Sequence, residues 1–132
     1  MITQKLQPFG TTVFAEMTAL AIERKAINLA QGFPDFEGPQ EIVEAAVQAI
    51  RSGRNQYARS RGHPPLVEAI AESQSRYYGL DYDPMSEVLV FNGATEGIAA
   101  SLLGLLNPGD EVILFEPFYD SYPPCLALAG AV

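Results

Sequence analysis

The sequence of 132 residues contains no tryptophan, one cysteine, one histidine and two lysines. The single cysteine, Cys125, excludes a disulfide within the chain and leaves no cluster of thiolates for zinc. The single histidine, His63, has no serine or cysteine nucleophile pattern around it, so we expect a loop histidine rather than part of a catalytic triad. These absences exclude a disulfide scaffold and a zinc cluster.

Positive charge and long apolar runs are also scarce. The net charge is −8 and no run of basic residues occurs, which argues against nucleic acid and anionic membrane as partners. No apolar stretch approaches the roughly 20 residues of a membrane-spanning helix, and the N-terminus lacks the apolar core of a signal peptide. Hydrophobic residues make up 48% and charged residues 18%, a composition that folds. We therefore expect an acidic, cytoplasmic α/β protein.

Residues 87–122 form the stretch around which the chain is organised. A short apolar run at 88–91 predicts a buried strand, and apolar residues at helical spacing follow it. Asn, Pro, Gly and Asp at 107–110 end the helix, and a second apolar run at 112–115 predicts another strand. Strand, turn, helix, turn and strand is the layout of an α/β domain.

The turn before this helix is a candidate anion site. Gly93 and Ala94 leave room for a ligand to approach the backbone, and the first amides of a helix have no partner within it. Those amides, the helix dipole and the Thr95 hydroxyl favour a phosphate. An alternative of equal weight is that Gly93 serves only the turn and Thr95 only caps the helix. The pattern is neither the dinucleotide fingerprint nor a P-loop.

Elsewhere the sequence predicts an irregular arm at 1–11 and a turn-rich loop at 26–36 that either packs on a core or lines a pocket. The predicted helices span residues 12–25, 39–52, 64–78 and 123–129, and residues 131–132 look like the start of a strand.

The connector from residue 51 to 62 carries the one concentration of positive charge. Its arginines are Arg51, Arg54, Arg59 and Arg61. Such a connector is usually a solvated loop, and the sharper hypothesis is that it faces a phosphate or a partner subunit.

Five motifs, taken together and in order, resemble the class I/II aminotransferases, which are fold-type-I enzymes dependent on pyridoxal 5′-phosphate. They are QGFPDF at 31–36, NQY at 55–57, NGATEG at 92–97, NPGDEV at 107–112 and EPFYDSY at 116–122. Within the family, we expect the kynurenine, glutamine and methionine transaminases to be near relatives, and the resemblance runs from about Phe14 to the last residue.

The resemblance implies a fold and a division into domains. The expected fold is α/β, with an N-terminal arm and helices followed by the first strands of a three-layer α/β/α large domain that is incomplete in this chain. Residues 1–36 would form the arm, a helix and a substrate-side loop, and residues 37–132 the start of the cofactor-binding domain. In the seven-stranded sheet of the family, strands corresponding to 87–91 and 111–115 are not neighbours, which would rule out a simple βαβ unit.

The resemblance also implies cofactor-binding residues. The amides of Ala94 and Thr95, after Gly93, would hold the cofactor phosphate, and the ring of Tyr119 would stack on the pyridine. Tyr57 would reach the phosphate of the neighbouring subunit, which implies a homodimer.

For the substrate, Gly32 resembles the glycine whose backbone contacts the carboxylate, and Phe14 matches a bulky position at the pocket. The implied reaction is reversible amino transfer between an amino acid and a 2-oxo acid. The donor stays open among kynurenine, glutamine, methionine and aromatic amino acids, and so does β-elimination on cysteine conjugates.

One departure from the family concerns catalysis. Neither lysine, Lys5 nor Lys25, matches the motif of the Schiff-base lysine, so no catalytic residue can be assigned. We expect an N-terminal portion of such an enzyme, inactive alone. One alternative is a truncated, non-catalytic protein that binds phosphate ligands or a full-length partner. Another is an unrelated phosphate-binding α/β domain, which would leave the ordered motifs unexplained.

Overall fold

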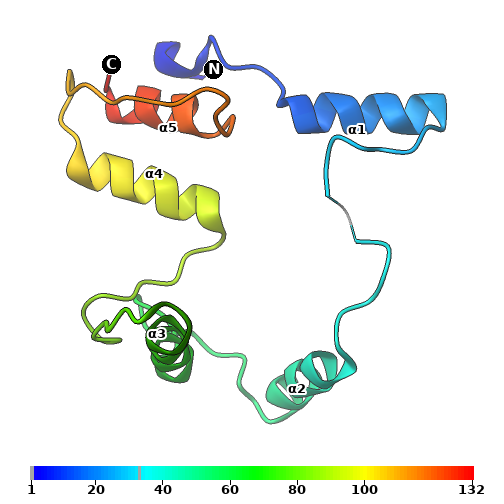
Figure 1. The fold of residues 1–132 in the computed structure, drawn as a ribbon, viewed down its shortest axis with the longest axis vertical. Coiled ribbons are helices and arrows are strands. Elements are labelled where there is room, and N and C mark those ends of the chain that lie inside the picture. The colour runs from blue at the N-terminus through cyan, green and yellow to red at the C-terminus, as the bar shows by residue number, and fades with distance from the viewer. Residues whose placement is uncertain (1, 33) are drawn as a thin grey trace. The chain divides into compact units, whose positions relative to one another are not determined.

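The computed structural model describes residues 2–32 and 34–132, and the regular elements of these residues are helices (Figure 1). In chain order they are η1 (Gln4–Leu6), α1 (Val13–Arg24), α2 (Gln40–Arg51), α3 (Pro64–Tyr78), α4 (Ala94–Leu105) and α5 (Tyr122–Ala129). Among these helices, none is long and apolar enough to cross a membrane. The chain divides into a terminal unit, Met1–Phe33 with Asn92–Val132, and a central unit, Pro34–Phe91. The domain division expected from the sequence stays a prediction.

The predicted helices form where local signals place them. Thr12 caps α1 by accepting a hydrogen bond from the Ala15 N–H at 3.2 Å. α3 begins at Pro64 and ends before Gly79, whose φ of 66° suits a residue without a side chain. Gly130 ends α5 in the same way, with a φ of 79°. Each of these helix ends depends only on residues that are adjacent in the sequence, so it can be predicted from the sequence.

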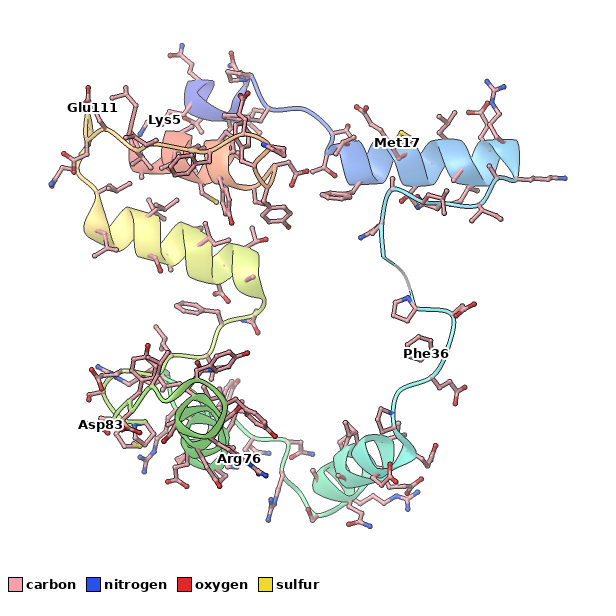
Figure 2. The ribbon with its side chains drawn as sticks, in the orientation of Figure 1. Lys5, Met17, Phe36, Arg76, Asp83 and Glu111 are labelled. Carbon is pink, nitrogen blue, oxygen red and sulfur yellow. The ribbon has the colours of Figure 1, made fainter. Side chains whose placement is uncertain are left out.

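The N-terminal arm is more regular than expected. The 3₁₀ helix η1 packs against α5, and the Lys5 ammonium lies 3.4 Å from the Leu128 carbonyl oxygen, near the C-terminal end of α5 (Figure 2). A cation is favoured there because the last carbonyls of a helix carry partial negative charge. This tertiary contact orders the arm, and the sequence gives no local sign of it.

The two predicted strands are not formed as strands in the described part of the chain, so that expectation is wrong for this structure. Instead, the segments are extended and make isolated bonds: the Val112 N–H donates to the Val132 carbonyl and the Val132 N–H to the Asp110 carbonyl, both at 2.9 Å. This exchange has the parallel pattern, but residues 131–132 are not formed as a strand, so the strand start expected there is not found. A strand needs a continuous ladder, and the chain supplies few pairing partners.

The segment after Asp110 still shows the alternation of a strand. Val112 and Leu114 line an apolar groove with residues of α4 and α5, whereas Ile113 and Phe115 are 82% and 86% exposed. Two-residue periodicity of this kind places alternate side chains on opposite faces. One face is thus covered by this chain and the other is not.

The core of the central unit is small. Val67 and Ala71 of α3 are buried together with Val88, and Ile70 and Val90 pack against them. The Val90 N–H donates to the Arg61 carbonyl at 3.0 Å, which ties the extended segment to the loop before α3. The predicted apolar run at 88–91 is therefore half-covered rather than sandwiched between two layers.

Candidate functional site

The N-terminus of α4 is open for an anion. Gly93 precedes the helix with φ 95° and ψ 162°, and a Cβ on it would meet no atom within 4 Å. No side chain caps this end, because the N-cap residue is Gly93 itself, and the carboxylate of Glu96 accepts from the Asn92 N–H, outside the helix. The first amides of α4, those of Ala94 and Thr95, thus have no side-chain cap and lie at the positive end of the helix dipole.

Tyr119 lies beside this helix end. Hydrogen bonding to the Ser121 hydroxyl, and secondly to the Thr95 hydroxyl, lowers the pKa of the Tyr119 phenol below its ordinary value of 10.0. Thr95 belongs to the first turn of α4, so the phenol and the open amides occupy one place in the terminal unit. Tyr119 as a whole residue is 42% exposed, which leaves area for a planar ligand.

Two further aromatic rings surround Tyr119. The Phe14 ring, from α1, lies 6.4 Å from it at an interplanar angle of 48°, and the Tyr122 ring lies 5.7 Å away edge-on at 85°. These distances are in the range of favourable aromatic pairs. The structure thus brings Phe14, Thr95 and Tyr119 together. Tyr122 and Ser121 were missed as site residues, although the aromatic cluster at 116–122 was the available signal.

Gly32 lies in the segment that returns along α1. The Asn28 side chain holds this segment in place. Its Nδ2 donates to the Thr18 hydroxyl at 3.0 Å, and its Oδ1 accepts from the Ala30 N–H at 3.0 Å. Gln31 then lines the same groove as Phe14. Gly32 is exposed, with nothing within 4 Å of the position of a Cβ, and its neighbour Phe33 lies outside the described residues.

Tyr57 belongs to the central unit and is fully exposed. It occurs in the connector between α2 and α3, where it lines a shallow hollow with Arg54 and His63. One arginine of this connector, although exposed, has partners within the unit: Nη1 of Arg61 donates to the carbonyl oxygens of Met85 and Ser86 at 3.3 and 2.8 Å.

Neither lysine is beside the aromatic cluster. Lys5 reaches Leu128, six residues along α5 from Tyr122 and so about 9 Å from it along the axis. Lys25 ends α1 in the left-handed conformation, with φ 52°. The cluster therefore gathers binding groups, and in the described residues neither lysine side chain lies among them.

The structure is similar to solved aminotransferases along nearly its whole length. With the N-succinyldiaminopimelate aminotransferase from Mycobacterium tuberculosis the TM-score is 0.93 at 56% identity, covering 99% of this chain and 34% of that one. With YbdL from Escherichia coli, whose structure identified a methionine aminotransferase function, the TM-score is 0.91 at 46% identity, covering 100% and 35%. The fold is therefore that of the N-terminal portion of a fold-type-I aminotransferase, as predicted.

The sequence comparisons agree. Residues 24–132 match the model of the family described as aminotransferase class I and II, and the chain belongs to this family. It is 56% identical over 131 residues to the probable N-succinyldiaminopimelate aminotransferase DapC of M. tuberculosis, covering 99% of this chain and 33% of that protein. It is 41% identical to the kynurenine–oxoglutarate transaminase of Dictyostelium discoideum, covering 98% and 30%. The chain spans about a third of the length of the curated relatives it matches.

Proposed function

We propose that this chain supplies the phosphate- and ring-binding part of a pyridoxal-phosphate-dependent aminotransferase. The observation that carries the proposal is the meeting of Thr95, Tyr119 and Phe14 at the uncapped N-terminus of α4. When bound, the cofactor withdraws electrons from the substrate and so allows an amino group to pass between an amino acid and a 2-oxo acid.

The residues present fit the cofactor. The amides of Ala94 and Thr95 would bind its phosphate, since Gly93 has no side chain to obstruct them. The exposed face of Tyr119 would stack on the pyridine ring and shield it from water. Tyr57, fully exposed in the central unit, would reach the phosphate in the neighbouring subunit of a homodimer.

The substrate would lie on the other side of the aromatic cluster. Phe14 would contact its side chain, and the Gly32 backbone its carboxylate. Because Phe14 also packs against Tyr119, a substrate that moves Phe14 would also shift Tyr119 and the cofactor ring stacked on it. The Schiff-base lysine would come from outside these residues, so we expect the 132-residue chain to be inactive alone. The location that we expect for the protein is the cytoplasm.

A titration compares pyridoxal phosphate with pyridoxal, which lacks the phosphate, in the aminotransferase that carries this sequence. We expect the phosphate to tighten binding at least tenfold, since charge-assisted hydrogen bonds contribute about 1.5–3 kcal/mol. Tyr119→Leu should weaken both ligands, whereas Tyr119→Phe, which keeps a ring, should weaken them less. Equal affinity for the two ligands would remove the proposed phosphate site.

A panel of amino donors tests the reaction itself. The relatives' names add N-succinyldiaminopimelate to the donors expected from the sequence, which are kynurenine, glutamine, methionine and aromatic amino acids. We expect 2-oxo acid to form from at least one donor, while pyruvate and ammonia from a cysteine conjugate would reveal β-elimination. A protein that binds the cofactor but converts no donor would favour the alternative, a non-catalytic protein that binds phosphate ligands or a full-length partner.

A further inference from the structure

The loop that carries Tyr57 is tied to the central unit at both of its ends. On the side of α2, the Arg54 N–H donates to the Ala49 carbonyl at 3.0 Å, and the Gly53 N–H to the Ile50 carbonyl at 3.1 Å. Gly53 has a φ of 80°, so the chain turns sharply as it leaves the helix. The loop therefore starts from a fixed point.

Arg61 makes the tie at the other end. Its guanidinium donates to the carbonyl oxygens of Met85 and Ser86, at 3.3 and 2.8 Å, and its own carbonyl accepts from the Val90 N–H at 3.0 Å. Both bonds come from one nitrogen, Nη1, whose two hydrogens can be donated to two neighbouring acceptors. One residue thus joins the loop to the segment that follows α3.

The acceptors of Arg61 are themselves held in place. Asp83 accepts from the Met85 N–H at 3.0 Å and from the Ser86 hydroxyl at 2.5 Å, so it closes the turn that presents both carbonyls. Figure 2 labels Asp83 in this turn, after α3. The Met85 and Ser86 carbonyls that accept from Arg61 therefore belong to a turn that is stabilised by its own side-chain hydrogen bonds.

Gly62 brings the loop end against the core. A Cβ on Gly62 would lie 2.7 Å from Val90 Cγ2 and 3.1 Å from Val67 Cγ1, and its φ is 124°. Val67 is the most deeply buried of the core residues of this unit. The position of Arg61 is thus fixed by close packing of its neighbour as well as by hydrogen bonds.

Between the two ties, Tyr57 is exposed on a short span. In the described residues of this span, no backbone hydrogen bond joins positions 55–58 to the rest of the unit. An aromatic side chain on an untied loop would lose much conformational freedom on binding, and anchoring both ends of the loop reduces that loss. The ties therefore affect how readily Tyr57 reaches a ligand outside its own unit.

We propose that Arg61 is a positioning residue for Tyr57: by binding the carbonyls of Met85 and Ser86 it holds the loop so that the phenol meets the cofactor phosphate. The inference rests on the proposed role of Tyr57. Arg61 acts here as a backbone clamp and contributes no direct contact to the phosphate.

The experiment measures the dissociation constant of pyridoxal phosphate in the aminotransferase that carries this sequence. Four enzymes form a double-mutant cycle: the unchanged enzyme, Tyr57→Phe, Arg61→Met and the double variant. Arg59→Met is the matched control, because it removes the same charge from the same loop and the structure gives its side chain no hydrogen bond to these carbonyls. Unfolding temperatures are recorded for all variants.

We expect Tyr57→Phe to weaken cofactor binding at least about tenfold, as for loss of a hydrogen bond to a charged group. Arg61→Met, which acts only through the loop, should weaken it less, by about fivefold. In the Tyr57→Phe background, Arg61→Met should change the constant by less than about twofold, since coupled residues are not additive. Arg59→Met should have no more effect than that.

Other outcomes overturn the proposal in distinguishable ways. If Tyr57→Phe leaves cofactor binding unchanged, the proposed role of Tyr57 fails and this inference fails with it. If Tyr57→Phe weakens binding but Arg61→Met has no effect, or an equal effect in both backgrounds, Arg61 does not act through Tyr57. An equal loss in Arg59→Met would show that charge, and not the clamp, is responsible.

Discussion

At the scale of single residues, Gly93 illustrates how a missing side chain serves a site. Its φ of 95° and ψ of 162° lie in a region that is almost confined to glycine, although the space around it is open. The backbone conformation, and not crowding, therefore requires glycine. It also keeps the amides of Ala94 and Thr95 uncovered.

We predict that Gly93→Ala lowers stability by about 1–3 kcal/mol, the cost of holding a side-chain-bearing residue in this conformation. Cofactor binding should weaken as well, because relaxing the strain would move the first amides of α4. The measurement is thermal unfolding with and without pyridoxal phosphate in the aminotransferase that carries this sequence.

Gly104, in the same helix, provides the control. It has no positive φ and open space around its Cβ position, so Gly104→Ala should stabilise the protein by about 0.5–1 kcal/mol. A destabilisation of equal size in both variants would contradict the conformational argument.

At the scale of elements, the turn after α3 depends on one ionised group. The Ser86 hydroxyl first, then the Met85 N–H and the positive charge of Arg61, lower the pKa of Asp83 below its ordinary value of 3.8. A carboxyl with a lowered pKa favours the folded state above its unfolded pKa, and this contribution is lost as the pH falls through the folded value. Acid should therefore loosen the turn that receives Arg61.

We predict that Asp83→Asn reduces stability at neutral pH, and that the difference from the unchanged protein shrinks as the pH falls below 3.8 and is lost once the pH has passed through the lowered pKa of the folded state. Ser86→Ala, which removes the largest cause of the shift, should reproduce part of this behaviour. Unfolding free energies measured across this pH range check both variants. A difference that stays constant into acid would mean that the Asp83 charge is not involved.

Also at this scale, the sequence predicts helices better than strands. Thr12, Pro64, Gly79 and Gly130 determine helix ends through local geometry, and the structure follows them. The apolar runs at 88–91 and 112–115 carry a strand pattern too, but a strand forms only against a partner. Local sequence cannot supply that partner.

At the scale of the whole molecule, the chain leaves much apolar area uncovered. In the described residues only Val67, Ala71, Val88, Cys125 and Ala129 are buried hydrophobics, whereas Leu29, Ile113 and Phe115 are more than 80% exposed. Since relatives of about three times this length share the fold, we attribute the exposure to missing neighbours.

We predict that the 132 residues expressed alone bind a hydrophobic dye and unfold without a sharp cooperative transition. Dye fluorescence and chemical denaturation monitored by circular dichroism provide the measurement, with the whole aminotransferase as the comparison. Steep cooperative unfolding without dye binding would show that the stretch forms an independent domain.

The candidate site could be predicted from the sequence only in part. The glycine before a helix indicated an anion site, and the motif at 116–122 drew attention to Tyr119. Nothing local indicated that Phe14, more than 100 positions earlier, would lie 6.4 Å from that ring. Nor could charge alone show that Arg61 binds carbonyls, because an arginine looks the same in sequence whichever acceptor it finds.

The uncovered face of the segment at 112–115 has a consequence during synthesis. In a protein of the relatives' length with this stretch at its N-terminal end, the chain still to be synthesised is about twice as long as the stretch itself. At ~5–20 residues per second, the ribosome needs about 13–53 s to synthesise that remainder. Throughout that interval Ile113 and Phe115 would be accessible to chaperones and to other nascent chains. The rate of translation after this stretch therefore bears on how much of the protein reaches its native state.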